Sequence, residues 1–317
     1  MNIKKFKFRF HQFGGWQLIF AFFKLGIAGV ALKQLLKVVF GRMGLNDAYD
    51  EIQERIDPKL VEQYSNMILP LKNKYDGLKL EHGHNDIVWF CWLQGMEEAP
   101  ELIKMCYRSQ QKYLKGKEIK LITYDTYQDY ITLPDYVVEK HKKGYLPHAL
   151  FSDLIRLELL IKYGGTWIDS TVLCTSSDYP EKVLKCDLFL FQARKDKKIV
   201  GMSNWFITSC TNNEALMILR DILYAYWKDY NCVLEYYIFH LFLGRILKYY
   251  PELLADMPPG NNAFPLTLRN YMEETYNKDF INNLFSRCCF HKLNYRVSEK
   301  AMKKKDSIYN WLINEQK

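Results

Sequence analysis

The stretch FSDLIRLELLIKYGGTWIDST, residues 151–171, decides the fold. Its first part belongs to a helical pattern over residues 148–163, with leucine and isoleucine side chains on one stripe. Gly164 and Gly165 are placed to end that helix, because glycine readily adopts the left-handed conformation found at helix C-termini. An apolar, aromatic run then follows at residues 166–173. The stretch therefore predicts a helix, a tight turn and a strand.

Polar residues stand at chemically useful points of this stretch. Asp153 and Arg156 are three residues apart, so they share one helix face, opposite the leucine stripe. Asp169 lies near the carboxyl end of the strand, where ligands bind in open α/β sheets, with Ser170 and Thr171 beside it. A carboxylate there can bind a hard cation or a ribose hydroxyl, and an Asp–Arg pair suits neighbouring hydroxyls of a polyol. An ordinary intrahelical ion pair and an Asp that caps a turn are the structural alternatives.

The sequence on either side extends the same alternation of strands and helices. Residues 86–93 and 118–125 have strand patterns and enclose a helical pattern at 98–115, which together form a strand, helix, strand unit. Residues 41–80 are typical of helix, interrupted at Pro58 and ended near Pro70. We therefore expect an α/β protein with a mixed, mostly parallel sheet flanked by helices. Further strands are expected at 187–192 and 203–208, and further helices at 213–228 and 232–249.

The charge is distributed unevenly along the 317 residues. Lys and Arg number 44 and Asp and Glu number 36, but eight basic residues precede the first acid, Asp47, and leave 36 bases against 36 acids. The net positive charge is therefore confined to an N-terminal segment, the basic head, and the rest of the chain has no net charge. This distribution argues against a general nucleic-acid-binding surface. The eight cysteines have no CxxC spacing and none stands with histidines at zinc-ligand spacing, so we expect reduced thiols and no structural zinc.

The basic head contains an apolar run at residues 16–32, with Lys24 at its centre. As one helix, this run places small and polar residues on a narrow side and large apolar residues over the rest. Such a helix could lie in the headgroup layer of an anionic membrane, which is the placement we favour. Packing in the protein core and spanning of the bilayer are the alternatives, although Lys24 would cost roughly 3 kcal/mol in a span. A cleaved signal peptide fits poorly, because helix-like sequence with further lysines continues beyond the run.

Several short motifs together resemble the capsular polysaccharide synthesis glycosyltransferases, a bacterial group related to the family 32 sugar transferases with their DXD motif. The resemblance covers most of residues 84–245. It rests on Ile87, Val88, Trp89, Cys91, Trp92, Leu93, Gln94, Gly95 and Pro100, on Ser152, Asp153, Arg156, Tyr163, Gly164, Gly165, Trp167, Asp169 and Thr171, and on Asn204, Trp205, Phe206, Glu235, Tyr236, Tyr237 and His240.

The resemblance implies a GT-A-like, Rossmann-like fold and a nucleotide-sugar donor whose anomeric configuration is retained. In related transferases the first strand and turn hold the base, and the helix Asp and Arg hold donor hydroxyls. The donor-binding residues implied here are Trp89, Trp92, Gln94, Ser152, Asp153, Arg156, Asp169 and Asn204, of which Asp153, Arg156 and Asp169 are the catalytic set. A divalent metal, Mn²⁺ or Mg²⁺, would use Asp169, Thr171 and His240. Thr171 departs from the DXD motif of the related transferases, which has a second carboxylate there.

The expected function is transfer of a sugar, with a UDP-sugar favoured, to a lipid-linked glycan in capsular polysaccharide synthesis. The expected location is the inner face of the cell membrane, held by residues 1–42, with a helical connector at 43–80 and the transferase domain at 81–317. An inactive membrane-bound protein that binds carbohydrate or nucleotide sugar is the main alternative. A nucleotidyl- or phosphotransferase is disfavoured, because the sequence has no GxxxxGK[ST] loop.

Overall fold

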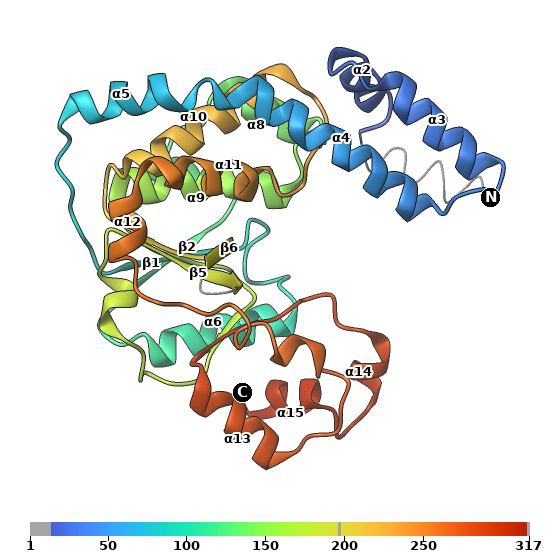
Figure 1. Ribbon diagram of the computed structural model, residues 1–317. Coiled ribbons are helices and arrows are strands. Elements are labelled where there is room, and N and C mark those ends of the chain that lie inside the picture. Colours follow the sequence, from blue (N-terminus) through green and yellow to red (C-terminus); the bar gives the residue numbers. More distant parts are fainter. Residues whose placement is uncertain (1–13, 196–197, 316–317) are drawn as a thin grey trace. The chain divides into compact units, whose positions relative to one another are not determined.

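The computed structural model describes residues 14–195 and 198–315 (Figure 1). The chain forms two compact units, each assembled from three separate segments. Unit 1 contains residues up to Leu80, Thr132–Leu157 and Glu214–Tyr249. Unit 2 contains Glu81–Ile131, Glu158–Asn213 and the chain from Tyr250 onward. The boundary between the units falls within one helix, α9 (His148–Tyr163), whose bounds match the predicted helix.

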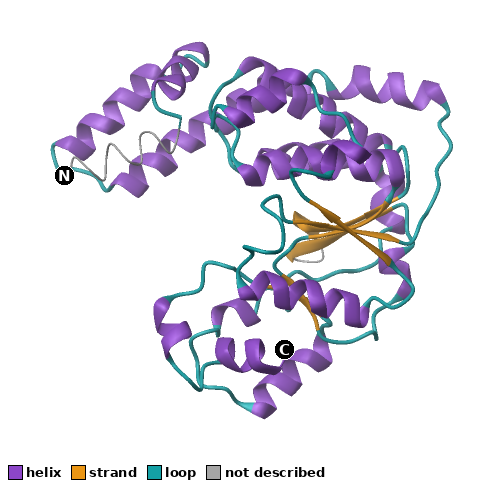
Figure 2. Cartoon of the chain, turned by 180° about the vertical axis from the view of Figure 1, so that it is seen from behind, coloured by secondary structure: helices purple, strands orange, loops and turns teal. Residues whose placement is uncertain are grey.

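Unit 2 is built on a five-stranded sheet with the order β2-β1-β3-β6-β5 (Figure 2). β1 pairs in parallel with β2 and β3, whereas β6 pairs antiparallel with both β3 and β5. Of these five strands, β6 therefore runs against the other four. The expected α/β class, with a mixed and mostly parallel sheet, is confirmed. The strands are β1 (Ile87–Cys91), β2 (Glu118–Ile122), β3 (Gly165–Ile168), β5 (Leu188–Lys195) and β6 (Lys198–Ser209).

The strand predicted at 166–173 is two strands. β3 ends at Ile168, and a turn follows in which the Val172 amide donates to the Asp169 carbonyl at 2.9 Å. The chain then leaves the main sheet as β4 (Val172–Cys174), which pairs antiparallel with β7 (Phe290–Lys292). The prediction of one strand was wrong, because both halves are buried and apolar and their sequence carries no mark of the change of partner.

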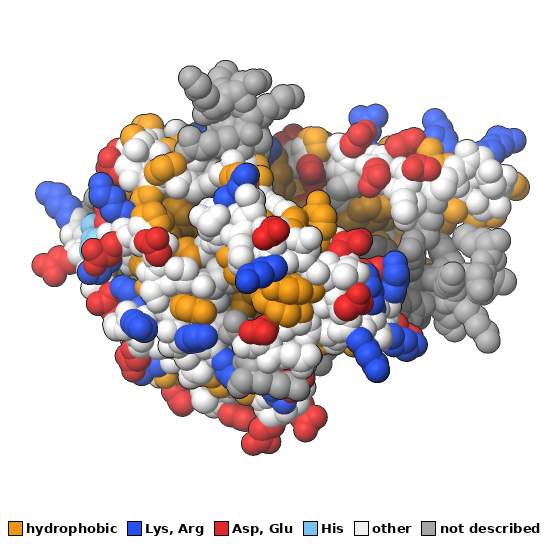
Figure 3. All heavy atoms as spheres, turned by 90° about the horizontal axis from the view of Figure 1, so that it is seen from below, with side chains coloured by type: hydrophobic (Ala, Val, Ile, Leu, Met, Phe, Trp, Pro, Cys, Tyr) orange, Lys and Arg blue, Asp and Glu red, His pale blue; other side chains and the backbone are white. Residues whose placement is uncertain are grey.

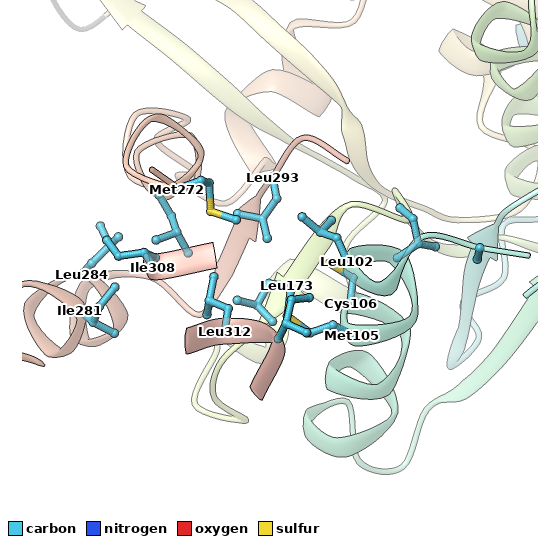
Figure 4. Packing of buried hydrophobic residues seen from close by; sticks show 14 of the residues in the cluster. Leu102, Met105, Cys106, Leu173, Met272, Ile281, Leu284, Leu293, Ile308 and Leu312 are labelled. Carbon is cyan, nitrogen blue, oxygen red and sulfur yellow. The ribbon is translucent and has the colours of Figure 1, made fainter. Parts of the chain in front are cut away.

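The core of unit 2 joins the sheet to helices from distant parts of the chain. Phe90 of β1 and Leu173 of β4 pack with α6 (Glu101–Tyr113), α13 (Lys278–Arg287) and α15 (Ile308–Glu315). In Figure 4, Leu102, Met105 and Cys106 of α6 lie close to Leu173 and to Leu312 of α15. The remaining short elements of unit 2 are α7 (Tyr127–Tyr130), η1 (Glu181–Leu184), α12 (Pro251–Asp256), η3 (Leu268–Asn270) and α14 (Glu299–Lys303).

Unit 1 is helical and centres on α10 (Glu214–Asp229), most of whose apolar residues are buried. α10 packs against α5 (Ile68–Leu78), α8 (Asp135–Lys142) and α11 (Ile238–Ile246), and Figure 1 shows α5, α10 and α11 as neighbours. α4 (Leu45–Ser65) contacts α11 and α3 (Ala28–Val39), and α2 (Trp16–Lys24) contacts α3. η2 (Leu247–Tyr249) extends α11.

Three local predictions for unit 1 were wrong. Pro58 lies inside α4 without ending it. Pro70 lies in the first turn of α5, where amide groups make no hydrogen bond within the helix, so the missing amide hydrogen of proline costs nothing there. The predicted single helix at 16–32 is broken, because Gly26 is left-handed, with a φ of 71°. Among the residues described, no helix is both long enough and apolar enough to cross a membrane.

Candidate active site

The carboxyl edge of the unit 2 sheet gathers four of the predicted site residues. The parallel register pairs Trp89 with Trp167, so β1 and β3 end at the same edge. Trp92 and Gln94 follow β1, and Asp169 follows β3. β6 runs antiparallel to β3, and the pairing of Phe206 with Ile168 places Asn204 at the same edge of the sheet. The fold thus collects residues from three neighbouring strands around one edge.

The two glycines are required where α9 turns into β3. Gly164 and Gly165 have φ values of 66° and 86°. A Cβ on Gly165 would lie 2.5 Å from the Ile87 carbonyl oxygen, and one on Gly164 would lie 3.0 Å from the Ser209 carbonyl oxygen. Backbone atoms cannot yield as flexible side chains do, so larger residues are excluded here. Close approach of β3 to its neighbours sets the position of Asp169.

Asp169 is held by hydrogen bonds to its backbone and to both carboxylate oxygens. Its amide donates to the Trp205 carbonyl at 2.8 Å. The Trp167 indole donates to Oδ1 at 2.8 Å, and the Lys292 ammonium lies 2.7 Å from Oδ2. The Asp169 side chain is 22% exposed, so the carboxylate is fixed in place and still reaches solvent.

Lys292 contacts both of the metal ligands that the sequence predicts in unit 2, Asp169 and Thr171. Its Nζ lies 2.7 Å from Asp169 Oδ2 and 2.5 Å from Thr171 Oγ1, so one ammonium contacts both oxygen ligands that the sequence offers in this unit. In the part of the chain that the structure describes, no group of three or more His, Cys, Asp or Glu residues is suited to hold a metal. The donor set of one carboxylate, one hydroxyl and a resident cation does not fit Mn²⁺ or Mg²⁺.

Sequence reasoning missed Lys292, which is 123 residues from Asp169. It comes to the site because β7 pairs with β4 and matches Lys292 to Val172. The Lys292 amide also donates to the Pro265 carbonyl at 2.9 Å, and the Leu293 amide donates to the Thr171 carbonyl at 2.8 Å. Strands of three residues carry no readable period, so no local signal could have indicated this pairing.

The residues predicted to hold the base differ in exposure. Trp89 is fully buried, donates its indole hydrogen to the Gly164 carbonyl at 2.9 Å and packs against Tyr130 and Tyr163, so we assign it a packing role. Trp92 is half-buried with its ring 5.4 Å from that of Tyr295, and Gln94 is exposed.

The residues around Asn204 are ordered by aromatic packing. Asn204 is half-buried and precedes Trp205, whose ring stacks on Phe191 at 4.5 Å. The Trp205 indole donates to Asn262 Oδ1 at 3.2 Å. This contact joins β6 to the loop that leads to Pro265, the backbone partner of Lys292.

Unit 1 holds the second polar pair. Arg156 Nη1 lies 2.9 Å from Asp153 Oδ1, one helical turn apart on α9. The two residues are 3% and 6% exposed, and the guanidinium lies 5.8 Å from the centre of the Phe239 ring. An ordinary surface pair is therefore excluded. The Ser152 hydroxyl donates to the Ala149 carbonyl at 2.7 Å, within the same helix.

His240, the third predicted metal ligand, belongs to α11 of unit 1. It is half-buried, and its ring lies 5.6 Å from that of Tyr237 and 5.9 Å from that of Phe239. These contacts are aromatic packing on its own helix. Asp169 and Thr171 belong to unit 2, so neither unit by itself holds the predicted ligand set.

Glu235, another residue of the resemblance, is a buried acid with an altered pKa. Burial, together with the neighbouring Asp57 carboxylate, raises the pKa of Glu235 to about 7. The Tyr237 amide and the Gln53 side chain donate hydrogen bonds to the Glu235 carboxylate. Unit 1 therefore contains one acid that is protonated more readily than usual near neutral pH.

Comparison with known proteins supplies the family. The family model of the capsular polysaccharide synthesis proteins matches residues 41–312. The chain belongs to the capsular polysaccharide synthesis protein family. Among solved structures, a chain named PaToxG glycosyltransferase is similar with 11% identity and a TM-score of 0.36, over 64% of this chain and 83% of that one. A comparison with curated proteins finds no match.

The family match begins after α3, so a helical hairpin formed by α2 and α3 lies outside the matched region. Large apolar side chains line one side of each helix: Trp16, Phe20 and Phe23 of α2 are 67–69% exposed, and Leu32, Leu36 and Val39 of α3 are 46–57% exposed. Ala21 and Ala31 are buried instead. Gln34 of α3 is buried as well, so each helix turns Ala21 or Ala31 toward the protein and the large side chains named above toward solvent.

Charges of both signs lie on the surface of the chain. On the face shown in Figure 3, Lys and Arg side chains are interspersed with Asp and Glu. In the hairpin, Lys24 pairs with Asp229 at 3.1 Å and Lys37 with Glu51 at 3.6 Å. The predicted basic head also includes Lys4, Lys5, Lys7 and Arg9, which lie outside the described residues.

Proposed function

We propose that this protein is a glycosyltransferase that takes a sugar from a nucleotide-sugar donor, a UDP-sugar in preference, and adds it to a lipid-linked glycan. The observation that carries the proposal is the cluster of Asp169, Thr171 and Lys292 at the carboxyl edge of the unit 2 sheet. A fixed carboxylate next to a cation suits a ribose hydroxyl and a diphosphate. Trp92 and Gln94 follow the neighbouring strand, where a base would lie in this proposal. Family membership supports a role in surface polysaccharide synthesis.

The buried pair of Asp153 and Arg156 supports recognition of a sugar. A carboxylate accepts and a guanidinium donates, so the pair together matches adjacent hydroxyls. Burial at 6% and 3% exposed keeps both groups in one orientation, as positioning of a substrate requires. We assign this pair to the donor sugar, with Ser152 ordering the same turn of α9.

Transfer with retention needs little from an acid or base of the protein. The acceptor hydroxyl attacks the anomeric carbon on the face that the diphosphate leaves, and the bond from that carbon to the phosphate oxygen breaks. The acceptor proton then passes to an oxygen of the departing diphosphate. The protein must stabilise the charge that develops on this leaving group.

The hairpin supports attachment to the inner face of the cell membrane. Burial of one exposed Phe, Leu or Val side chain gains roughly 1.5–3 kcal/mol, and α2 and α3 offer five such side chains besides Trp16. Lys33 is exposed on the same helix as Leu32 and Leu36 and would meet anionic headgroups. Flotation with anionic vesicles tests this part, and replacement of Phe20 and Phe23 by Ser should abolish it.

A panel of nucleotide sugars tests the transferase itself. Each donor is incubated with the full chain, and release of the nucleoside diphosphate is measured with and without a lipid-linked acceptor. We expect release with one donor class, and an increase when the acceptor is present. An inactive binding protein would give a thermal shift with a donor but no release, and this outcome would replace the proposed function by the binding alternative.

A further inference from the structure

We propose that Lys292 takes the place of the divalent metal, so that the leaving diphosphate is stabilised by an ammonium group and turnover needs no metal ion. The inference rests on the proposed function and deepens it. It follows from a disagreement: the family resemblance implies Mn²⁺ or Mg²⁺ at Asp169, whereas a lysine contacts Asp169 and Thr171 at 2.7 and 2.5 Å.

The position of Lys292 is fixed by its backbone. It ends β7, where it is paired with Val172, and its amide donates to the Pro265 carbonyl. Its side chain is 20% exposed. A lysine on a mobile surface loop would contribute little, but one anchored on both sides by backbone hydrogen bonds is held where the charge is needed.

Electrostatics favour a diphosphate at this site over a metal ion. Asp169 and Lys292 cancel in charge, so the pair offers no net negative charge to attract a cation. A divalent cation next to the ammonium would be repelled, because both carry positive charge. A diphosphate is negatively charged, so the ammonium group attracts it.

The Lys292 ammonium group also has an N–H hydrogen that can be donated to the diphosphate. Of its three N–H bonds, two account for the contacts with Asp169 and Thr171 among the described residues, and the third can reach a phosphate oxygen. As the bond between the anomeric carbon and the phosphate oxygen breaks, the electron pair stays on the oxygen. Lys292 remains protonated and donates a hydrogen bond to it, while the acceptor proton goes to another phosphate oxygen. Lys292 is thus a catalytic residue, and Asp169 and Thr171 position it.

The first test is removal of metal from the full-length protein. We expect donor turnover to change less than about twofold in excess EDTA, and Mn²⁺ binding measured by electron paramagnetic resonance to be weaker than millimolar without donor. Loss of turnover in EDTA with recovery on addition of Mn²⁺ would overturn the inference. So would tight Mn²⁺ binding to the wild-type protein, a result that needs no turnover.

The second test changes the lysine. Lys292→Met should lower turnover by roughly 30- to 1,000-fold and weaken pyrophosphate binding in EDTA at least 10-fold, whereas Lys292→Arg keeps a positive charge and should lose less. Lys300→Met, at an exposed lysine of the same unit, is the matched control. Full pyrophosphate binding by a folded Lys292→Met variant would overturn the inference. If Lys292→Met does not fold, the Mn²⁺ measurement on the wild-type protein still decides.

A third variant asks whether the metal site can be restored. Thr171→Asp combined with Lys292→Ala provides two carboxylates without the ammonium, and this variant should bind Mn²⁺ and depend on it. If it binds no more Mn²⁺ than the wild-type protein does, Lys292 is not what excludes the metal and the inference fails. Absence of turnover by the wild-type protein with every donor, with and without metal, would instead refute the proposed function.

Discussion

The ion pair of Asp153 with Arg156 in unit 1 and that of Asp169 with Lys292 in unit 2 are built in opposite ways. The first spans one helical turn of α9 and is almost fully buried. The second joins residues 123 positions apart and leaves about a fifth of each side chain exposed. Two charges that are removed from water depend on each other for stabilisation. A partly exposed pair still contacts solvent, so a ligand can reach it. We therefore expect the first pair to contribute strongly to the stability of unit 1, and the second to be the more accessible to a ligand.

The largest effect is expected when the buried pair is broken. Arg156→Met leaves the Asp153 carboxylate buried without its cation and should reduce the free energy of unfolding by about 3–5 kcal/mol. Urea denaturation measures this loss. The double variant Asp153→Asn with Arg156→Met removes both charges and should recover part of it. A loss below about 1 kcal/mol would show that burial does not make the pair structural.

The second-largest effect is expected for Asp169→Asn, which should lower turnover and leave the free energy of unfolding nearly unchanged. Loss of the charged contacts should remove about 2–4 kcal/mol of transition-state stabilisation, a fall in rate of roughly 30- to 1,000-fold. The free energy of unfolding should change by about 1 kcal/mol or less, since the pair is partly exposed. Asp178→Asn, at an exposed position in unit 2, is the control. Near-normal transfer by Asp169→Asn would mean that this edge is not the active site.

The smallest effect concerns the buried acid Glu235, whose neighbours are Gln53, the Tyr237 amide and Asp57. Its pKa is about 7 in the folded chain against the ordinary glutamate value of 4.5, so the folded state binds a proton more tightly. The stability that this proton contributes is complete below about pH 4.5 and is lost as pH rises through 7, by up to roughly 3–4 kcal/mol.

Thermal melting over this pH range measures the Glu235 effect. Glu235→Gln should flatten the pH dependence between pH 4.5 and 7 and stabilise the protein at pH 8 relative to wild type. A variant with an unchanged profile would place the titration on another group. That result would mean that the charge of Glu235 is balanced in the folded chain, as the charge of Asp153 is balanced by Arg156.

The sequence predicted local features of the fold well and distant ones poorly. α9 spans the predicted residues because its pattern is long and two glycines end it. The position of Asp169 at the carboxyl edge of the sheet followed from a strand predicted to end there, whereas Trp92 and Asn204 came from the family resemblance, and Asn204 lies on the antiparallel strand β6. The exit of β4 from the main sheet and the approach of Lys292 depend on pairing between short strands far apart in the chain. Such pairing is decided by packing of the whole unit and leaves no local pattern.

The pairing of β4 with β7 has a consequence for how the protein is made. During synthesis the helix α9, the glycine turn and Asp169 leave the ribosome well before Lys292, and a chain that has only reached β6 lacks the cation of its own site. Donor binding should therefore appear late, after most of unit 2 has emerged, and not as soon as the central sheet can form. A nascent chain arrested before residue 292 would hold the Asp169 carboxylate without its lysine, and under the proposed role of Lys292 it should release little or no sugar from a donor.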